Sequence, residues 1–306
     1  MKAIVGYTGF VGQNIAAKGD FDAKYNSKNI QDAYGTNPDF LVYAGMSAEK
    51  YLANHEPEKD YAKVQGALEN IKKINPKKLV LISSSDVFAR PIGVDENTVI
   101  VADEIEPYGR NRFLLEQDVR AIYPDATIVR LPALYGVGIK KNFVYDFIKR
   151  IPFMLTTAKY NELIEKDDFI VPFYADQGNG FYKCHFDTEE ERLALKDYFV
   201  RIGFSALQFT DSRSKFQFYP LRLLWDYIQI ALKNDIRLLN IVTEPISAAE
   251  VYKYVTGEEF VNELKKTPAD YDIHSIYAEL YGGKGHYMLD REFILEDLKQ
   301  FIVSSN

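Results

Sequence analysis

Three glycines near the start of the chain have the spacing of a phosphate-binding turn. Gly6, Gly9 and Gly12 follow the apolar run Ala3-Ile4-Val5, which is typical of a first strand. Glycine permits a tight turn and lets a pyrophosphate approach the backbone, while the amide groups at the start of the next helix favour negative charge. The spacing predicts a dinucleotide site, and its position after a first strand makes a glycine turn without a ligand the weaker alternative. The residues of this predicted site are Gly6, Gly9, Phe10, Val11 and Gly12.

The end of the second expected strand bears on the choice of cofactor. This strand covers residues 21–25 and ends in Asn26-Ser27-Lys28. A site that selects NAD usually has an Asp or Glu there, which accepts a hydrogen bond from the ribose 2′-hydroxyl. No carboxylate stands at this end, and Ser27 and Lys28 could donate to a 2′-phosphate, so we expect NADP(H) to be favoured over NAD(H). The alternative is a solvated turn in which Lys28 contacts nothing.

The first half of the chain alternates short apolar runs with helical patterns. The runs are residues 3–5, 40–43, 79–82 and 127–131, and apolar residues recur at helical spacing in 61–74 and 112–122. This alternation predicts an α/β fold with a Rossmann-type, doubly wound parallel sheet.

The second half has a different texture, rich in aromatic residues after about position 155. Residues 169–174 and 181–186 flank a Gly-containing turn and predict a hairpin. Thr188 followed by Glu191 is typical of a helix start with a capping box. Residues 238–242 predict one more strand, which returns to the main sheet.

The returning strand makes the two expected domains interleaved. We expect an NAD(P)-binding domain from residues 1–155 and roughly 216–245. A smaller α/β substrate-binding domain would take residues 156–215 and 246–306.

Composition narrows the possible partners. The 306 residues carry 37 Lys and Arg against 44 Asp and Glu, a net charge of -7, which disfavours a nucleic-acid partner. Cys184 is the single cysteine and only four histidines occur, so neither a disulfide nor a structural metal site is expected. The apolar runs are far shorter than the roughly 20 residues of a membrane span, so we expect no membrane insertion and a cytoplasmic protein.

Five motifs occur in an order that identifies a family. After the glycine turn come Val42-Tyr43-Ala44-Gly45, Ser83-Ser84-Ser85-Asp86, Pro107-Tyr108-Gly109 and the run from Arg130 to Gly136. In this order the chain resembles the extended short-chain dehydrogenase/reductase superfamily, the NAD-dependent epimerases and dehydratases, over most of residues 1–140. The short stretch between Gly12 and Phe40 is similar to the compact nucleotide-sugar reductase branch.

The resemblance implies a catalytic pair. Ser84 matches the catalytic Ser or Thr of the family, Tyr108 matches its acid/base tyrosine, and Ala44 and Gly45 lie where the cofactor is contacted. A tyrosine with a pKa near 10 needs a nearby cation to act as a base at neutral pH. The family has a lysine four residues after the tyrosine, and this sequence has Arg112, which keeps the charge and could fork onto a ribose diol. The alternatives are a buried core tyrosine and a strand-end serine cap.

The resemblance also implies a nucleotide-sugar substrate, bound by the C-terminal domain. Ser85 and Asp86 lie beside the catalytic serine, and Asn142 and Arg213 stand where relatives contact the nucleotide. Arg213 is the candidate for the diphosphate, and a loop cap is the alternative for Asn142. The aromatic segment 156–205 suits either substrate stacking or a subunit contact.

Together these features predict an NAD(P)-dependent oxidoreductase or epimerase that acts on a nucleotide-linked or related sugar by hydride transfer, with Tyr108 exchanging the proton. A 4-keto reductase or epimerase is favoured over a dehydratase, because Ser85-Asp86 rather than Asp-Glu follows Ser84. The alternative is a non-catalytic NAD(P)-binding regulatory or accessory subunit, for which Arg112 is the main support. The resemblance implies a homodimer that pairs helices 61–74 and 112–122.

Overall fold

The computed structural model describes residues 1–305, which form two compact units. The first unit comprises residues 1–139, 215–247 and 269–297, and the second comprises 140–214, 248–268 and 298–305. The predicted domain bounds therefore differ from the packing at residues 140–155 and 269–297. The segment 269–297 stays with the first unit because β15 (Asp272–Ile273) pairs in parallel with β5 (Ile92–Val94). The binding role predicted for each domain stays a prediction.

The first unit is built on a six-stranded parallel sheet with strand order β13-β6-β4-β3-β1-β2. Its strands are β1 (Lys2–Val5), β2 (Ala23–Tyr25), β3 (Phe40–Tyr43), β4 (Leu79–Ser84), β6 (Thr127–Leu131) and β13 (Leu238–Asn240). The Rossmann-like α/β fold is thus confirmed, and so is the strand that returns to the sheet after residue 237. Strands with helices on both faces are apolar on both sides, which explains the short continuous apolar runs.

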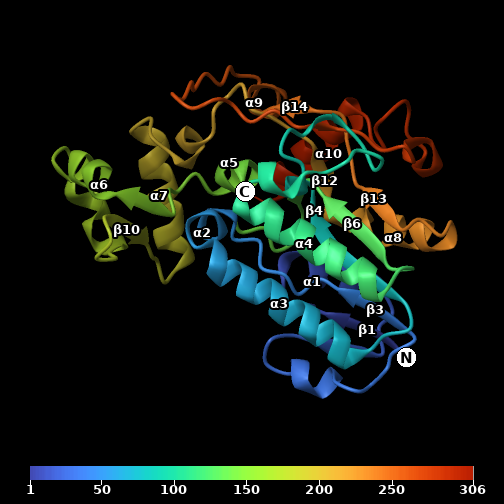
Figure 1. Cartoon of the computed structure of the whole chain (residues 1–306). Helices are drawn as coiled ribbons and strands as arrows, with labels where there is room; N and C mark the ends of the chain where they lie inside the picture. Colours follow the sequence, from blue (N-terminus) through green and yellow to red (C-terminus); the bar gives the residue numbers. More distant parts are fainter. Residues whose placement is uncertain (306) are drawn as a thin grey trace. The chain divides into compact units, whose positions relative to one another are not determined.

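Helices cover both faces of this sheet. On one face α3 (Pro57–Ile74) and α4 (Pro107–Ile122) run side by side (Figure 1). On the other face α1 (Phe10–Lys18) and α8 (Leu224–Lys233) pack together. Both α3 and α4 begin several residues before the predicted starts, because a proline is well suited to the first helical position, where its missing N–H is not needed.

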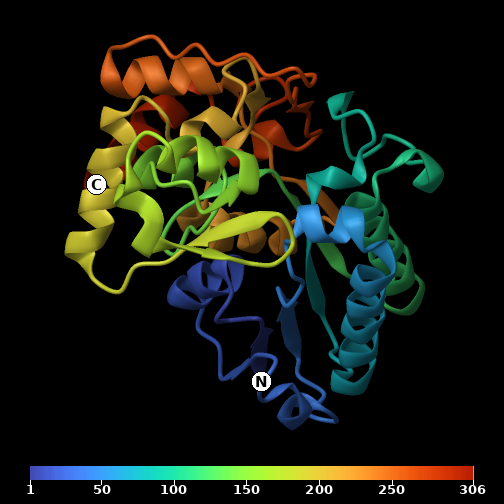
Figure 2. The same ribbon diagram turned by 90° about the vertical axis from the view of Figure 1, so that its left-hand side faces the viewer.

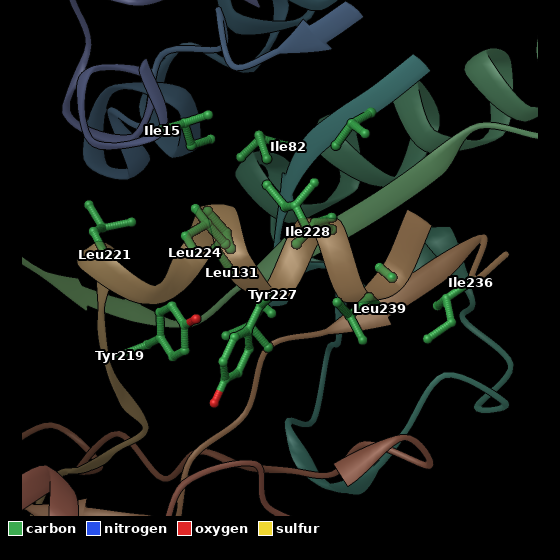
Figure 3. Packing of buried hydrophobic residues seen from close by; sticks show 14 of the residues in the cluster. Ile15, Ile82, Leu131, Tyr219, Leu221, Leu224, Tyr227, Ile228, Ile236 and Leu239 are labelled. Atoms are coloured by element: carbon green, nitrogen blue, oxygen red, sulfur yellow. The ribbon is translucent and has the colours of Figure 1, made fainter. Parts of the chain in front are cut away.

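Alternate residues of the central strands fill two separate apolar clusters. Leu41 and Leu79 pack with the buried faces of α3 and α4, whereas their neighbours Val42 and Val80 pack with α1 and α8. Figure 3 shows part of the second cluster, in which Ile228 of α8 lies among buried side chains of the sheet and of α1. The sheet is therefore held from both sides, and its strand ends are fixed in place.

The remaining elements of the first unit are short. They are α2 (Lys50–His55), β7 (Ala133–Tyr135), β11 (Lys215–Phe216), β12 (Phe218–Pro220), β14 (Ile246–Ser247) and the 3₁₀ turns η1 (Ile30–Ala33), η2 (Ser85–Val87), η3 (Ala102–Glu104), η6 (Leu221–Leu223) and η7 (Ala278–Tyr281). Helix α10 (Arg291–Ser304) ends the described chain.

The second unit contains a small antiparallel sheet of order β8-β10-β9 (Figure 2). The predicted hairpin is present, but its first strand is shorter than expected. Residues 169–173 belong to a 3₁₀ helix, because Asp167 caps the turn through the Phe169 amide and Pro172 cannot donate to a ladder. The elements are α5 (Phe143–Lys149), β8 (Met154–Thr156), α6 (Thr157–Ile164), η4 (Asp168–Phe173), β9 (Tyr174–Asp176), β10 (Phe181–Cys184), α7 (Glu189–Arg201), η5 (Ala206–Phe209) and α9 (Ala248–Thr256).

The capping box predicted from Thr188 and Glu191 is confirmed at the start of α7. Among residues 1–305, no helix combines the length and apolarity needed to cross a membrane.

One glycine controls how closely α4 approaches the sheet. A Cβ atom on Gly109 would lie 1.8 Å from the backbone oxygen of Asp86 in η2. No side chain fits there, so the Tyr-Gly pair brings Tyr108 against the end of β4.

We expect Gly109→Ala to destabilise the protein by about 2 kcal/mol or more, because the helix must move away from Asp86. The matched control is Gly66→Ala in the middle of α3, where no atom lies within 4 Å of the new Cβ. That change should stabilise by up to about 1 kcal/mol, since alanine is the better helix former. Urea unfolding compares the two, and equal effects would contradict the close contact at Gly109.

Candidate active site

The glycine turn connects β1 to α1. Gly6 has φ +88°, and a Cβ there would lie 2.4 Å from the carbonyl oxygen of Ala44. A Cβ on Gly12 would lie 2.1 Å from the Gly6 oxygen. These two glycines are therefore required by the fold itself.

Gly9 differs from the other two glycines. It is exposed, and apart from its chain neighbours the atom of residues 1–305 that lies near its absent Cβ is the Gly6 oxygen, at 3.3 Å. It stands at the N-cap of α1, where no side chain caps the helix. A side chain would thus meet little protein, and the space beside the helix start suits an anionic group.

The turn lies where the strand order of the sheet reverses. β1 has β2 on one side and β3 on the other, so the chain winds in opposite directions from this point. Gly6 and the Ala44-Gly45 pair meet at the carboxyl ends of β1 and β3, where the Ala44 amide donates to the Val5 carbonyl at 2.9 Å. Open α/β sheets bind ligands in the crevice at such a reversal.

The end of β2 forms a compact turn beside β1. The Gly6 amide donates to the Tyr25 carbonyl at 2.8 Å, and the Asn26 side-chain oxygen accepts from the Lys28 amide at 2.9 Å. Asn26 therefore shapes the turn, a role that the sequence interpretation did not include. Ser27 and Lys28 are exposed at its tip.

Ser84 and Tyr108 are brought together as predicted. Ser84 ends β4 and its Oγ accepts from the Asp86 amide at 3.2 Å, which is also the strand-end cap of the alternative interpretation. Tyr108, in the first turn of α4, lies close enough to Ser84 for the serine hydroxyl to lower the pKa of the phenol. Tyr108 is 6% exposed, and its backbone amide donates to Asn54 Oδ1 at 2.9 Å. Asn54 was not identified from the sequence.

The environment of Tyr108 keeps its phenol protonated. Burial raises the pKa of Tyr108, the Arg112 guanidinium lowers it, and the Asp86 carboxylate raises it, with a net increase. The guanidinium carbon of Arg112 lies 4.3 Å from the centre of the Tyr108 ring. At neutral pH this tyrosine is a proton donor, which suits protonation of a developing alkoxide.

Arg112 is buried in an ion pair that was not foreseen. It is 3% exposed and donates to both oxygens of Asp60, at 2.6 and 3.0 Å, and to the Ser47 carbonyl at 2.6 Å. Asp60 is 5% exposed and also accepts from Asn111 at 2.9 Å. Burial alone would raise the pKa of Asp60, but these hydrogen bonds hold it below its usual value. Contact of Arg112 with a ribose stays a prediction.

A signal for Asp60 was present in the sequence. Residues 60, 64, 67, 71 and 74 lie on one face of α3, and all five are buried. A carboxylate on an otherwise apolar helix face needs a buried cationic partner. This pattern does not identify which cation pairs with Asp60, since Arg112 is 52 residues away in the sequence.

Asp86, predicted to contact substrate, has two partners in this structure. It accepts from Lys50 Nζ at 2.7 Å and from the Tyr271 hydroxyl at 2.9 Å. Lys50 and Tyr271 are themselves 3.3 Å apart. Neither residue was identified from the sequence. Ser85, the other predicted neighbour, is buried.

The two predicted substrate contacts of the second unit also have structural partners. Asn142 caps α5, and its Oδ1 accepts from two backbone amides at 3.0 and 3.3 Å, as in the loop-cap alternative. Arg213 donates to both oxygens of Asp211, at 2.9 and 2.8 Å, and to Glu263 at 3.0 Å. A diphosphate would have to compete with these carboxylates for Arg213. Substrate contact by either residue stays a prediction.

We expect Asp60→Asn to destabilise the first unit by about 3 kcal/mol, because it leaves the buried Arg112 charge unpaired. The control is Glu69→Gln, which removes an exposed ion pair with Lys72 on the same helix and should change little. Asp60 has a lowered pKa in the folded chain, so its stabilisation is present at neutral pH and is lost on acidification. The difference between wild type and Asp60→Asn in urea unfolding should therefore shrink below about pH 4. A difference that is independent of pH would contradict the pairing.

Comparisons with known proteins agree with this architecture. Residues 19–164 match the family model described as the NAD dependent epimerase/dehydratase family. No curated protein sequence matches the chain significantly.

Several solved structures share the fold. A dTDP-4-dehydrorhamnose reductase from Yersinia enterocolitica is 14% identical with a TM-score of 0.65, and both chains are covered to 99%. A second such reductase, from Bacillus anthracis and in complex with NADP, is 16% identical with a TM-score of 0.64 and the same coverage of 99% of each chain. A UDP-glucose 4-epimerase from Thermotoga maritima, with UDP-glucose, is 15% identical with a TM-score of 0.61 over 99% of this chain and 98% of the other. The match over residues 19–164 and the shared fold confirm the predicted resemblance to the NAD-dependent epimerase/dehydratase family.

Proposed function

We propose that the protein is an NAD(P)-dependent oxidoreductase or epimerase that acts on a nucleotide-linked sugar by hydride transfer. The observation that carries this proposal is that Ser84, at the carboxyl end of β4, and Tyr108, at the start of α4, lie close together. In the same sheet, the glycine turn lies at the carboxyl end of β1. The folds shared with dTDP-sugar reductases and a UDP-sugar epimerase support the substrate class.

The chain's own residues would bind the cofactor and supply the proton. The open position at Gly9 and the amides at the start of α1 fit a pyrophosphate, and Ala44 and Gly45 border the same crevice. The nicotinamide, when bound, would supply or accept the hydride. Ser84 would orient a sugar oxygen by a hydrogen bond, and Tyr108 would donate a proton to that oxygen.

The protonation state of Tyr108 favours one direction of the chemistry. A keto reductase needs an acid at this position, and the raised pKa of Tyr108 keeps it protonated at neutral pH. Oxidation of an alcohol needs the phenolate, which the same environment disfavours. Among the proposed activities we therefore favour reduction of a keto sugar.

A cavity in the second unit supports recognition of an aromatic group. Its volume is about 360 Å³, and its walls are Asp146, Phe153, Met154, Leu155, Thr156, Lys159, Phe181 and Phe209. Three phenylalanine rings suit stacking against a nucleobase. Burial raises the pKa of Asp146 to about 7, so this carboxyl changes charge near neutral pH.

Cofactor preference and oligomeric state complete the proposal. Lys28 and Ser27 are exposed donors at the end of β2, with no carboxylate between Asn26 and Lys28, which supports NADP(H). Helices α3 and α4 pack against each other, as the proposed homodimer would require of each copy.

The second candidate function is a non-catalytic NAD(P)-binding subunit, and the burial of Arg112 against Asp60 favours it.

We expect NADPH to bind more tightly than NADH, because Lys28 can pair with the 2′-phosphate. Lys28→Ala should weaken NADPH binding several-fold and leave NADH binding unchanged. Gly9→Asp serves as the control that loses both, because it places a carboxylate where the pyrophosphate would lie while keeping the fold. Titrations at one salt concentration test this, and equal affinities in the wild type would refute the preference.

Tyr108→Phe should reduce the rate of hydride transfer to a keto-sugar nucleotide by about a hundredfold or more, since it removes the proton donor. Arg112→Lys should also lose activity, because an ammonium cannot form the forked contact with Asp60. Single-turnover oxidation of the bound reduced cofactor gives the rates, and cofactor affinity gives the control. Wild-type rates for Tyr108→Phe would defeat the mechanism. Absence of turnover in all three proteins, with cofactor still bound, would favour the non-catalytic subunit.

A further inference from the structure

Three side chains from distant parts of the sequence meet beside the Ser84–Tyr108 pair. Asp86 of η2 accepts from Lys50 at 2.7 Å and from Tyr271 at 2.9 Å, both at the same carboxylate oxygen. The backbone amide of Asp86 donates to Ser84 Oγ at 3.2 Å. The cluster of Lys50, Asp86 and Tyr271 is thus linked directly to the proposed catalytic serine.

Lys50 is held in this cluster from both sides. The Ser47 carbonyl, three residues before it, accepts from Arg112 at 2.6 Å. Asn54, four residues after it, accepts from the Tyr108 amide at 2.9 Å. Both anchors belong to α4, the helix that carries Tyr108. These contacts hold the segment on either side of Lys50 against the start of that helix and so place Lys50 within reach of Asp86.

Other charges around α4 are already matched by partners of their own. Asp60 on α3 pairs with Arg112, Asp103 of η3 pairs with Arg110 at 3.2 Å, and Glu116 pairs with Arg130 at 2.6 Å. On the segment before α3, Glu49 pairs with Lys63 at 3.3 Å.

Asp86 is the carboxylate whose charge acts on Tyr108, where it raises the pKa. Lys50 is the cation in contact with that carboxylate, and Tyr271 contributes a hydroxyl that stays protonated, because burial and Asp86 raise its pKa to about 12. Burial opposes the charge of Lys50, but Asp86 and Tyr271 raise its pKa above the usual value. Lys50 is therefore a permanent positive charge at neutral pH.

We propose that Lys50 is a positioning residue for Tyr108, which neutralises Asp86 and holds its carboxylate against Tyr271 so that Tyr108 can act as the proton donor. Arg112 occupies the sequence position of the family's lysine and lies over the Tyr108 ring, and its bonds to Asp60 and to the Ser47 carbonyl also fasten the segment that carries Lys50. The catalytic consequence rests on the proposed function. The electrostatic coupling between Lys50, Asp86 and Tyr108 does not.

The coupling is measured without substrate. Tyr108 is replaced by 3,5-difluorotyrosine, whose more acidic phenol can be titrated by ¹⁹F NMR in the intact protein, in the wild-type background and in Lys50→Met, Asp86→Asn and the double variant. Lys50→Met should raise the phenol pKa by about one unit, because it leaves the Asp86 charge uncompensated. Asp86→Asn should lower it, and the double variant should return toward the Asp86→Asn value. Lys72→Met, on the exposed face of α3, is the matched control and should leave it unchanged.

An unchanged phenol pKa in Lys50→Met, with Asp86→Asn still lowering it, would overturn the inference. If Lys50→Met unfolds, Lys50→Gln gives the same comparison with a shorter neutral side chain, and the same outcomes apply. Thermal unfolding of each variant identifies that case.

The catalytic consequence is read from the pH profile of keto-sugar reduction. Lys50→Met should lower kcat about tenfold, move the basic limb of the profile to higher pH, and leave cofactor affinity unchanged. If Asp86→Asn restores part of the rate of Lys50→Met, the loss of rate in Lys50→Met comes from the unpaired Asp86 charge rather than from lost structure. Absence of reduction in every protein, with the expected ¹⁹F shifts, refutes the proposed function alone. Active protein without the shifts refutes the role of Lys50 alone.

Discussion

The contact between Gly109 and the backbone of Asp86 is the constraint on which the candidate active site depends. It brings the start of α4 against the end of β4, where no side chain would fit at position 109. As a result Tyr108 reaches Ser84, and Asp86 is close enough for its charge to act on the phenol. Ser47, just before α2, and Asn54, within α2, both accept hydrogen bonds from residues of the same helix α4. One backbone approach thus determines the positions of the proton donor, its serine partner and the nearby charges.

Much of the fold could be predicted from local patterns. Strands with helices on both faces give short, continuous apolar runs. A turn as crowded as Gly6 to Gly12 has room only for glycine at its closest contacts, and these glycines can be recognised in the sequence. Helix starts were less accurate, since α3 and α4 extend back to Pro57 and Pro107. Of the strand expected at residues 169–174, only residue 174 lies in a strand, because the local cap from Asp167 and the proline outweigh the aromatic composition at 169–173. Segment 269–297 was assigned to the wrong packing unit, since the β5–β15 pairing joins residues about 180 positions apart.

The site was predictable only where a motif names the residue. Ser84 and Tyr108 come close together as expected, because the start of α4 packs against the end of β4. Lys50 and Tyr271 could not be found in this way, because they lie 221 residues apart and no motif links them to each other or to Asp86. Arg213 illustrates a different difficulty, since an arginine suited to a phosphate is equally suited to Asp211 beside it. Residue type predicts the chemistry that is available, whereas the folded chain decides which partner is nearest.

The pairing of Arg112 with Asp60 limits how this sequence can change. Position 112 lies on α4 and position 60 on α3, and each side chain supplies the charge that the other needs in a site closed to water. A neutral residue introduced at either position alone leaves a buried ion without its counterion. A lysine at position 112 would keep the charge but offer a single point contact in place of a fork. Exchange of Arg112 for the family's lysine therefore keeps a counterion for Asp60 but gives up the fork, whereas loss of charge at one of the two positions calls for a matching change at the other.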